Sequence, residues 1–136
     1  MKERFPRVEV NLLEMQSSCS RTTESRTGTP ASLMVVVHRV AGRCPVYREG
    51  DGFRVLDGYR LVANQPVCLH ALMSLAPYYV ALSRGVAPEE LGLAGPDGAA
   101  YVRCLDPAEV TGGGSVTFRV EVLGPEAARR DGDYEV

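Results

Sequence analysis

The sequence predicts an α+β domain: a small, mostly antiparallel sheet of four to five strands packed on one kinked, Pro-interrupted helix. Three observations predict this class. Short β-branched and alternating runs recur between residues 31 and 124. An Asp-Gly pair separates two of these runs, as in a tight hairpin. One long stretch with helical spacing of apolar residues lies between the earlier and the later strands.

Length and composition restrict the class of protein. A chain of 136 residues with 45% hydrophobic and 24% charged residues suits one globular domain. The net charge is −2 without a basic block, which argues against a nucleic-acid partner. No apolar run approaches the ~20 residues that cross a bilayer, and the N-terminus lacks the apolar part of a signal peptide. We therefore expect no membrane association and a cytoplasmic location.

Residues 1–30 differ from the rest of the chain. Residues 16–30 are small and polar without an apolar period, and such a segment buries too little surface to offset its ordering entropy. We expect 1–30 to be a flexible N-terminal extension, 31–124 to be the α+β domain and 125–136 to be a charged tail that frays. Within the extension, Val8–Leu13 is amphipathic and could add a strand or short helix. Cys19 lies there too, and we expect it to matter least of the four cysteines.

The first strands follow from local signals. The β-branched run Leu33–Val40 predicts a strand. Phe53–Leu56 and Tyr59–Val62 flank Asp57-Gly58, which predicts a hairpin with a type I′ turn, because both central residues of that turn need positive φ. Gly50-Asp51-Gly52 predicts a second tight turn before the hairpin.

A helix is expected next. Asn64 can cap it, Pro66 fits its first turn, and Gly85 lies just past its end. Its buried stripe is predicted at Cys68, Leu72, Leu75, Tyr79 and Leu82. Pro77 interrupts the pattern, and an interior proline costs about 3 kcal/mol. The helix therefore kinks there, or one helix ends near Leu75 and another begins at Pro77.

The C-terminal half predicts two further strands. Ala99–Leu105 is the first, and Asp106-Pro107 ends it. Gly112–Gly114 is expected to form a flexible loop; it lacks the Lys-Ser/Thr sequel of a nucleotide-binding loop. The last strand has the clearest alternation, with Val116, Phe118, Val120 and Val122 on one face.

Three cysteines occupy comparable positions at the ends of predicted elements. Cys44 lies in a loop before Pro45, Cys68 in the first helical turn, and Cys104 at the end of a strand. Element ends can converge in a compact sheet-plus-helix domain, so these thiols are candidate ligands of one metal centre. Tetrahedral zinc would take a fourth ligand, for which His70 is the nearest candidate. A four-iron cluster with one open corner would also suit three thiolates.

Other interpretations of the cysteines stay open. No Cys-x-x-Cys pair is present, so the spacing alone is a weak metal signal. On an ideal helix Cys68 and His70 point about 200° apart, so both reach one metal only if the helix begins late or irregularly. The thiols could instead form a redox pair, or simply pack as small hydrophobes.

Four stretches of the sequence resemble a known family. They are CPVYREGDGFRV, VCLHALMSLAPYYVALSRGVAPEELGL, AAYVRCLDP and TGGGSVTFRV, and together they resemble a family of small uncharacterised prokaryotic proteins over roughly residues 34–123. The resemblance implies a fixed pattern of three cysteines that maps onto Cys44, Cys68 and Cys104. The histidine after the helix cysteine is not a fixed part of this pattern. The family has no assigned function and is associated with organisms rich in iron–sulfur chemistry.

The sequence thus leads to two functional hypotheses. The first is a small metal- or iron–sulfur-binding domain with an accessory or carrier role, in which Cys44, Cys68, Cys104 and His70 are the candidate ligands. The second is a non-catalytic interaction module whose cysteines only pack, and which dimerises through an exposed edge strand. The residues specify neither a reaction nor a substrate.

Overall fold

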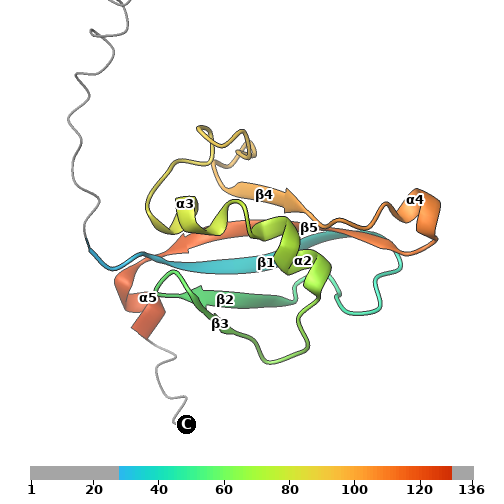
Figure 1. Cartoon of the computed structure of the whole chain (residues 1–136), viewed down its shortest axis with the longest axis horizontal. Helices are drawn as coiled ribbons and strands as arrows, with labels where there is room; N and C mark the ends of the chain where they lie inside the picture. The colour runs from blue at the N-terminus through green and yellow to red at the C-terminus, as the bar shows by residue number, and fades with distance from the viewer. Residues whose placement is uncertain (1–27, 130–136) are drawn as a thin grey trace, which may run out of the picture.

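The computed structural model describes residues 28–129. The predictions for residues 1–27, which include Val8–Leu13 and Cys19, and for residues 130–136 lie outside the described residues. Within 28–129 the chain forms a five-stranded sheet in which every neighbouring pair is antiparallel, together with short helices (Figure 1). The predicted class, α+β with a mostly antiparallel sheet, is confirmed.

The sheet is built around its two longest strands. Its order is β3-β2-β1-β5-β4. The central pair runs in register from Ser32 opposite Leu123 to Gly42 opposite Gly114, with one irregularity between Val37 and Arg39. The strands are β1 (Ser32–Gly42), β2 (Gly52–Leu56), β3 (Arg60–Val62), β4 (Ala100–Arg103) and β5 (Gly114–Leu123).

The predicted hairpin is present between β2 and β3. Asp57 has φ 54° and Gly58 has φ 83°, so both central residues of the turn are left-handed. The Tyr59 amide donates to the Leu56 carbonyl at 3.1 Å and closes the turn. Asp57-Gly58 therefore sets the register of the hairpin, as its residue types predict.

The single kinked helix is replaced by two short helices. α2 (Leu69–Leu75) ends before Pro77, and α3 (Tyr79–Ser83) begins after it. Pro77 has no N–H to donate and its ring crowds the preceding turn, so the chain breaks the helix there rather than bending it. The helix also begins later than predicted: Cys68 is the N-cap of α2, so Asn64 and Pro66 precede the helix.

The region around the three glycines is more ordered than predicted. A short helix, α4 (Ala108–Thr111), precedes it, and Gly112 ends that helix with φ 71°. Gly114 is already the first residue of β5, not part of a loop. At the start of the segment predicted to be a charged tail, Pro125–Arg129 form the short helix α5.

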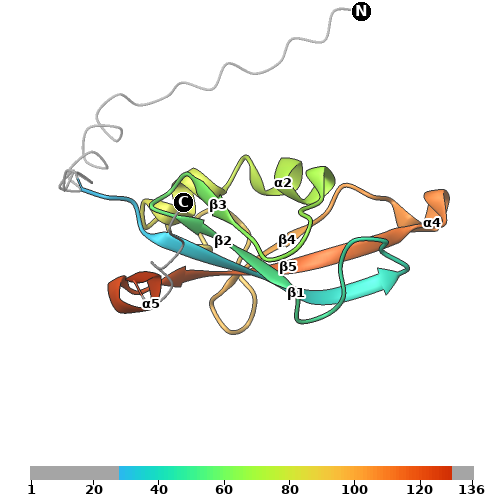
Figure 2. The ribbon, with the colours of Figure 1, turned by 90° about the horizontal axis from the view of Figure 1, so that it is seen from below.

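The core lies between one face of the sheet and helices α2 and α3, which both lie over that face in Figure 1. Figure 2 shows α2 on this side of the sheet. The inward side chains alternate along the central strands and meet apolar residues of the helices. The buried residues include Leu33, Val35 and Val37 of β1, Val116, Phe118 and Val120 of β5, and Ala71, Leu75 and Leu82 of the helices. The other face carries His38 and Tyr101, whose rings meet edge to face at 5.1 Å.

Candidate functional site

The three cysteines predicted as ligands line one cavity of about 210 Å³. Cys44 reaches it from the loop after β1, Cys68 from the start of α2, and Cys104 from the end of β4. All three are free, half-buried thiols. His70 and Asp106 lie on the same cavity. The site is thus assembled from segments up to 60 residues apart in the chain, at the end of the sheet where β1 ends and β5 begins.

Cys44 is positioned by close contact between its loop and β5. The Arg43 amide donates to the Gly113 carbonyl at 3.2 Å. A Cβ on Gly114 would lie 2.4 Å from the Cys44 nitrogen, so only glycine allows this approach. The Tyr47 amide in turn donates to the Cys44 sulfur at 3.4 Å. This contact joins two residues of the same loop and ties the Cys44 sulfur to the backbone beside the cavity.

Cys104 is also held by backbone hydrogen bonds, in this case to β5 near Gly114. Its amide donates to the Val116 carbonyl at 2.8 Å, which continues the pairing of β4 with β5 by one residue. Its sulfur accepts the Val116 amide at 3.2 Å and lies 3.9 Å from the Gly114 carbonyl oxygen. Two of the three cavity sulfurs therefore accept a backbone N–H.

Cys68 is held through its backbone by Tyr47. As the N-cap of α2 it has extended geometry, and its carbonyl accepts the first helical amide, that of Leu72. Its own amide donates to the Tyr47 hydroxyl at 3.0 Å. Because Cys68 precedes the helix, the expectation that it lies in the first helical turn is corrected by one position.

Tyr47 is a site residue that the sequence reasoning missed. It is 3% exposed, lines the cavity, and packs edge to face on Phe118 at 5.5 Å. Burial is the main cause that raises the pKa of its hydroxyl above the ordinary value, and charge on Cys68 and Cys44 adds to the rise. The phenol therefore stays neutral beside the thiols. The sequence signal that could have indicated Tyr47 as a site residue is its position three residues after Cys44.

His70 and Asp106 lie at the margin of the cavity. His70 is on α2 and exposed to solvent. Asp106 is half-buried, and its carboxylate accepts the Thr111 hydroxyl at 2.5 Å, which ties the end of β4 to α4. The sequence predicts only that Asp106-Pro107 ends a strand, and the fold places Asp106 on the same cavity as the cysteines.

The arrangement limits which metal centre fits. Among residues 28–129, no three His, Cys, Asp or Glu side chains are grouped so that they could hold a metal ion. Zinc bound at ~2.3 Å would need sulfurs within about 4 Å of each other. A four-iron cluster allows longer distances between the sulfurs, because each cysteine binds a different iron. The cavity is also far larger than the ~10–15 Å³ that holds one water. Among the described residues, the three thiols thus share a cavity without belonging to a group that could hold a single metal ion.

Comparison with known proteins finds no family model, no curated protein and no solved structure that matches the chain significantly. The helices between residues 28 and 129 are all too short to cross a membrane.

Proposed function

We propose that the protein binds an iron–sulfur cluster, or another thiolate-bound metal centre, through Cys44, Cys68 and Cys104, and acts as an accessory or carrier domain. The observation that carries the proposal is the shared cavity: three free thiols from distant parts of the chain line it together. A cluster held there would supply electron transfer or an iron open to a further ligand.

The chain's own residues would prepare the cavity for such a centre. The backbone amides of Tyr47 and Val116 point at the sulfurs of Cys44 and Cys104. Hydrogen bonds of this kind lower the negative charge density on a thiolate and are among the levers that set the potential of cysteine-bound clusters. Three thiolates leave one position for another ligand, and Asp106 and His70 line the same cavity. The proposal requires the sulfurs to adjust around the cluster.

The alternative, an interaction module that dimerises through a sheet edge, stays a prediction with weaker support. The outer strands β3 and β4 are three and four residues long. The Tyr101 amide of β4 already donates to the Leu93 carbonyl on its outer side, and Ala94 bridges to Ala100. Short and partly covered edges offer little backbone to a second copy.

Anaerobic purification and reconstitution with ferrous iron and sulfide test the proposal. We expect the full chain to bind iron and acid-labile sulfide together and to gain broad visible absorption. Cys44→Ser, Cys68→Ser and Cys104→Ser should each lose most of this absorption, whereas Cys19→Ser, outside the described residues, is the matched control and should retain it. A wild-type chain that stays colourless and free of iron and zinc after reconstitution would overturn the proposal.

A further inference from the structure

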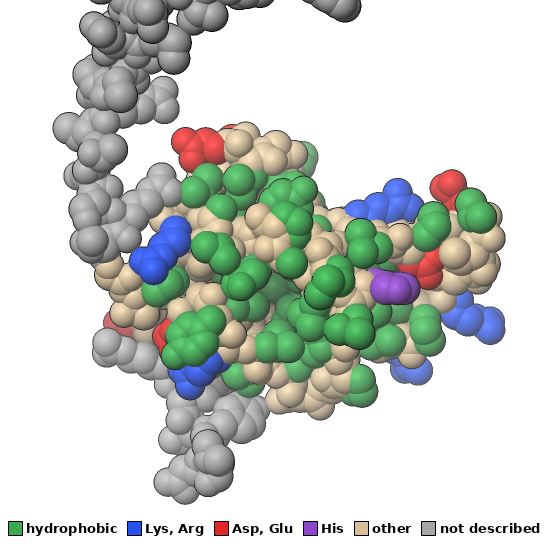
Figure 3. All heavy atoms as spheres, viewed as in Figure 1, with side chains coloured by type: hydrophobic (Ala, Val, Ile, Leu, Met, Phe, Trp, Pro, Cys, Tyr) green, Lys and Arg blue, Asp and Glu red, His purple; other side chains and the backbone are tan. Residues whose placement is uncertain are grey.

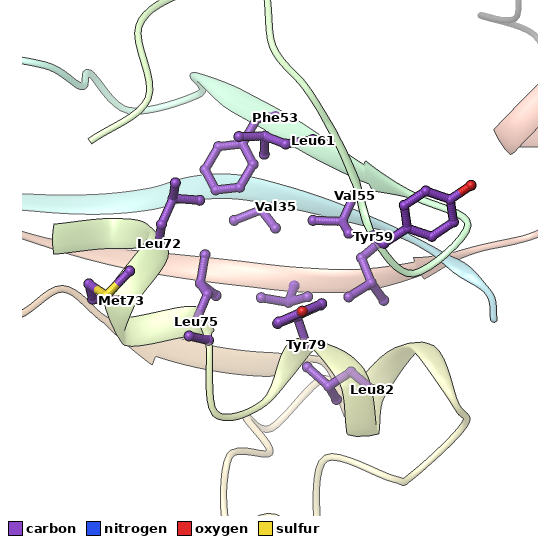
Figure 4. Close-up of a pocket in the computed structure, with 13 residues that line it drawn as sticks. Val35, Phe53, Val55, Tyr59, Leu61, Leu72, Met73, Leu75, Tyr79 and Leu82 are labelled. Atoms are coloured by element: carbon purple, nitrogen blue, oxygen red, sulfur yellow. The ribbon is translucent and has the colours of Figure 1, made fainter. Parts of the chain in front are cut away.

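A second cavity lies under the two helices and shares no residue with the cysteine site. Its volume is about 250 Å³. Val35 and Val55 of the sheet form its floor, and Leu72 and Leu75 of α2 line one wall (Figure 4). The lining side chains are aliphatic or aromatic throughout, and the hydroxyls of Tyr59 and Tyr79 are their only hydrogen-bonding groups. The cavity is thus suited to apolar side chains.

This second cavity opens to the surface as an apolar groove, and the mouth of the groove exposes large apolar side chains. Tyr59 is 75% exposed, Met73 55% and Leu61 44%, and all three line the groove. In Figure 3 apolar side chains gather across the same face, around a hollow. Single exposed apolar residues are ordinary, but a hollowed apolar patch marks a surface that another group covers.

The N-terminal part of the chain joins the body beside this groove. The Gly28 carbonyl accepts a hydrogen bond from Arg84 Nη1 at 2.6 Å, and the Ala31 amide donates to the Ser83 carbonyl at 2.8 Å. Gly28, Pro30 and Arg84 share a surface depression with Tyr59, which is also a wall of the groove. Residues 1–27 therefore connect to the described part of the chain at Gly28, beside the Tyr59 end of the groove.

The sequence of those residues contains one segment that matches an apolar groove. Val8, Val10 and Leu12 alternate with Glu9 and Asn11, so an extended segment would present its apolar side chains on one side. Residues 14–27 separate this segment from Gly28, and fourteen residues span up to roughly 46 Å when extended. A tether of this length gives an effective concentration on the order of millimolar, so even a weak contact is populated.

We propose that Val8–Leu13 docks into the apolar groove between α2, α3 and the sheet of its own chain, with its apolar side chains beside Leu72 and Met73. This inference rests on the groove and on the point where the chain enters the body, and it is independent of the metal centre.

NMR of the full chain with labelled methyl groups tests the docking. We expect contacts between methyls of Val8–Leu13 and those of Leu72 and Met73, unchanged on dilution. Val10→Asp combined with Leu12→Asp should abolish these contacts and shift the Leu72 and Met73 methyls, while Ser18→Asp with Thr22→Asp, the matched control in the tether, should leave both unchanged. Met73→Lys changes the groove instead of the segment. Because Met73 is exposed, this substitution should abolish the docking of Val8–Leu13 without affecting the core.

A second copy of the chain or a small apolar molecule in the groove would give different experimental results. Contacts that vanish on dilution and appear between differently labelled chains would show that a second copy fills the groove, which overturns the proposal. A small apolar molecule that co-purifies, detected by native mass spectrometry and lost with Met73→Lys, would overturn it as well. The absence of any contact from Val8–Leu13, with the Leu72 and Met73 methyl shifts unchanged by Val10→Asp combined with Leu12→Asp, would do the same.

Discussion

Gly114 and Cys44 approach so closely that no side chain fits between them: a Cβ on Gly114 would lie 2.4 Å from the Cys44 nitrogen and 2.8 Å from its Cα. The same glycine places its carbonyl oxygen 3.9 Å from the Cys104 sulfur. One residue at the start of β5 thus brings two of the three candidate ligands to the same cavity.

Gly114→Ala should therefore destabilise the fold and disturb the cavity. The methyl would meet backbone atoms, which cannot rotate away, so we expect a loss of about 1–3 kcal/mol in the free energy of unfolding. Urea denaturation measures this loss. Gly124→Ala is the matched control, since nothing lies within 4 Å of the added methyl there, and it should change stability by less than about 0.5 kcal/mol. Equal effects of the two substitutions would contradict this account.

Tyr47→Phe should weaken the attachment of α2 to the cavity. The phenol oxygen of Tyr47, a buried residue, is the acceptor of the Cys68 amide. Removing it leaves a half-buried N–H without that partner, at a cost of about 1–2 kcal/mol. Tyr59→Phe, at a ring that is 75% exposed, is the control and should be close to neutral. Hydrogen exchange at the Cys68 amide should accelerate only in the first variant.

The parts of this fold that were predictable have local causes. Asp57-Gly58 determines the hairpin because the turn needs two left-handed residues, and the pair supplies them. The alternation of Val116, Phe118 and Val120 places these residues on the buried face of β5. The sequence indicates only that cysteines at the ends of elements can converge, and in the fold all three line one cavity.

The parts that failed depend on contacts between distant segments. Asn64 and Pro66 are good helix-start residues, yet the helix begins at Leu69, after the Cys68 amide has bonded to Tyr47, which lies 21 positions earlier in the chain. The glycines at 112–114 predict a flexible loop, whereas Gly114 allows close packing against a loop 70 residues earlier in the chain. Neither hydrophobic periodicity nor secondary-structure propensity indicates a contact between segments this far apart in the chain.

Acid should weaken the interaction between β5 and the loop before β4. The Arg119 guanidinium, which bonds the Asp97 carboxylate at 2.9 Å, lowers the pKa of Asp97, and the Tyr101 hydroxyl and the Ala99 amide add to the effect. A lowered pKa contributes stability that is present above the ordinary carboxyl value of about 3.9 and is lost as pH falls through the folded value. Asp97→Asn should thus be less stable than wild type at pH 6, with a difference that shrinks at pH 3.

Glu109→Gln is the control for this pH dependence, because Glu109 is exposed on α4, away from the Asp97 pair. Urea unfolding at both pH values should give the same small difference from wild type. A constant Asp97→Asn penalty across the two pH values would show that the carboxylate acts through packing and not through its charge.

Loading the cysteine cavity should stabilise the folded chain, because a centre bound only by the folded state adds its binding free energy to stability. At a hundredfold excess over Kd the gain is about 2.7 kcal/mol, or on the order of 10 °C in Tm for a domain of this size. Thermal unfolding before and after anaerobic reconstitution should show this rise for wild type and Cys19→Ser, and a chelator that strips the iron should reverse it. Cys68→Ser should unfold near the metal-free wild-type Tm under both conditions. A rise in Tm that is equally large in Cys68→Ser would place the binding elsewhere in the chain, because Cys68 joins the cavity to the start of α2 and a centre held there depends on its thiol.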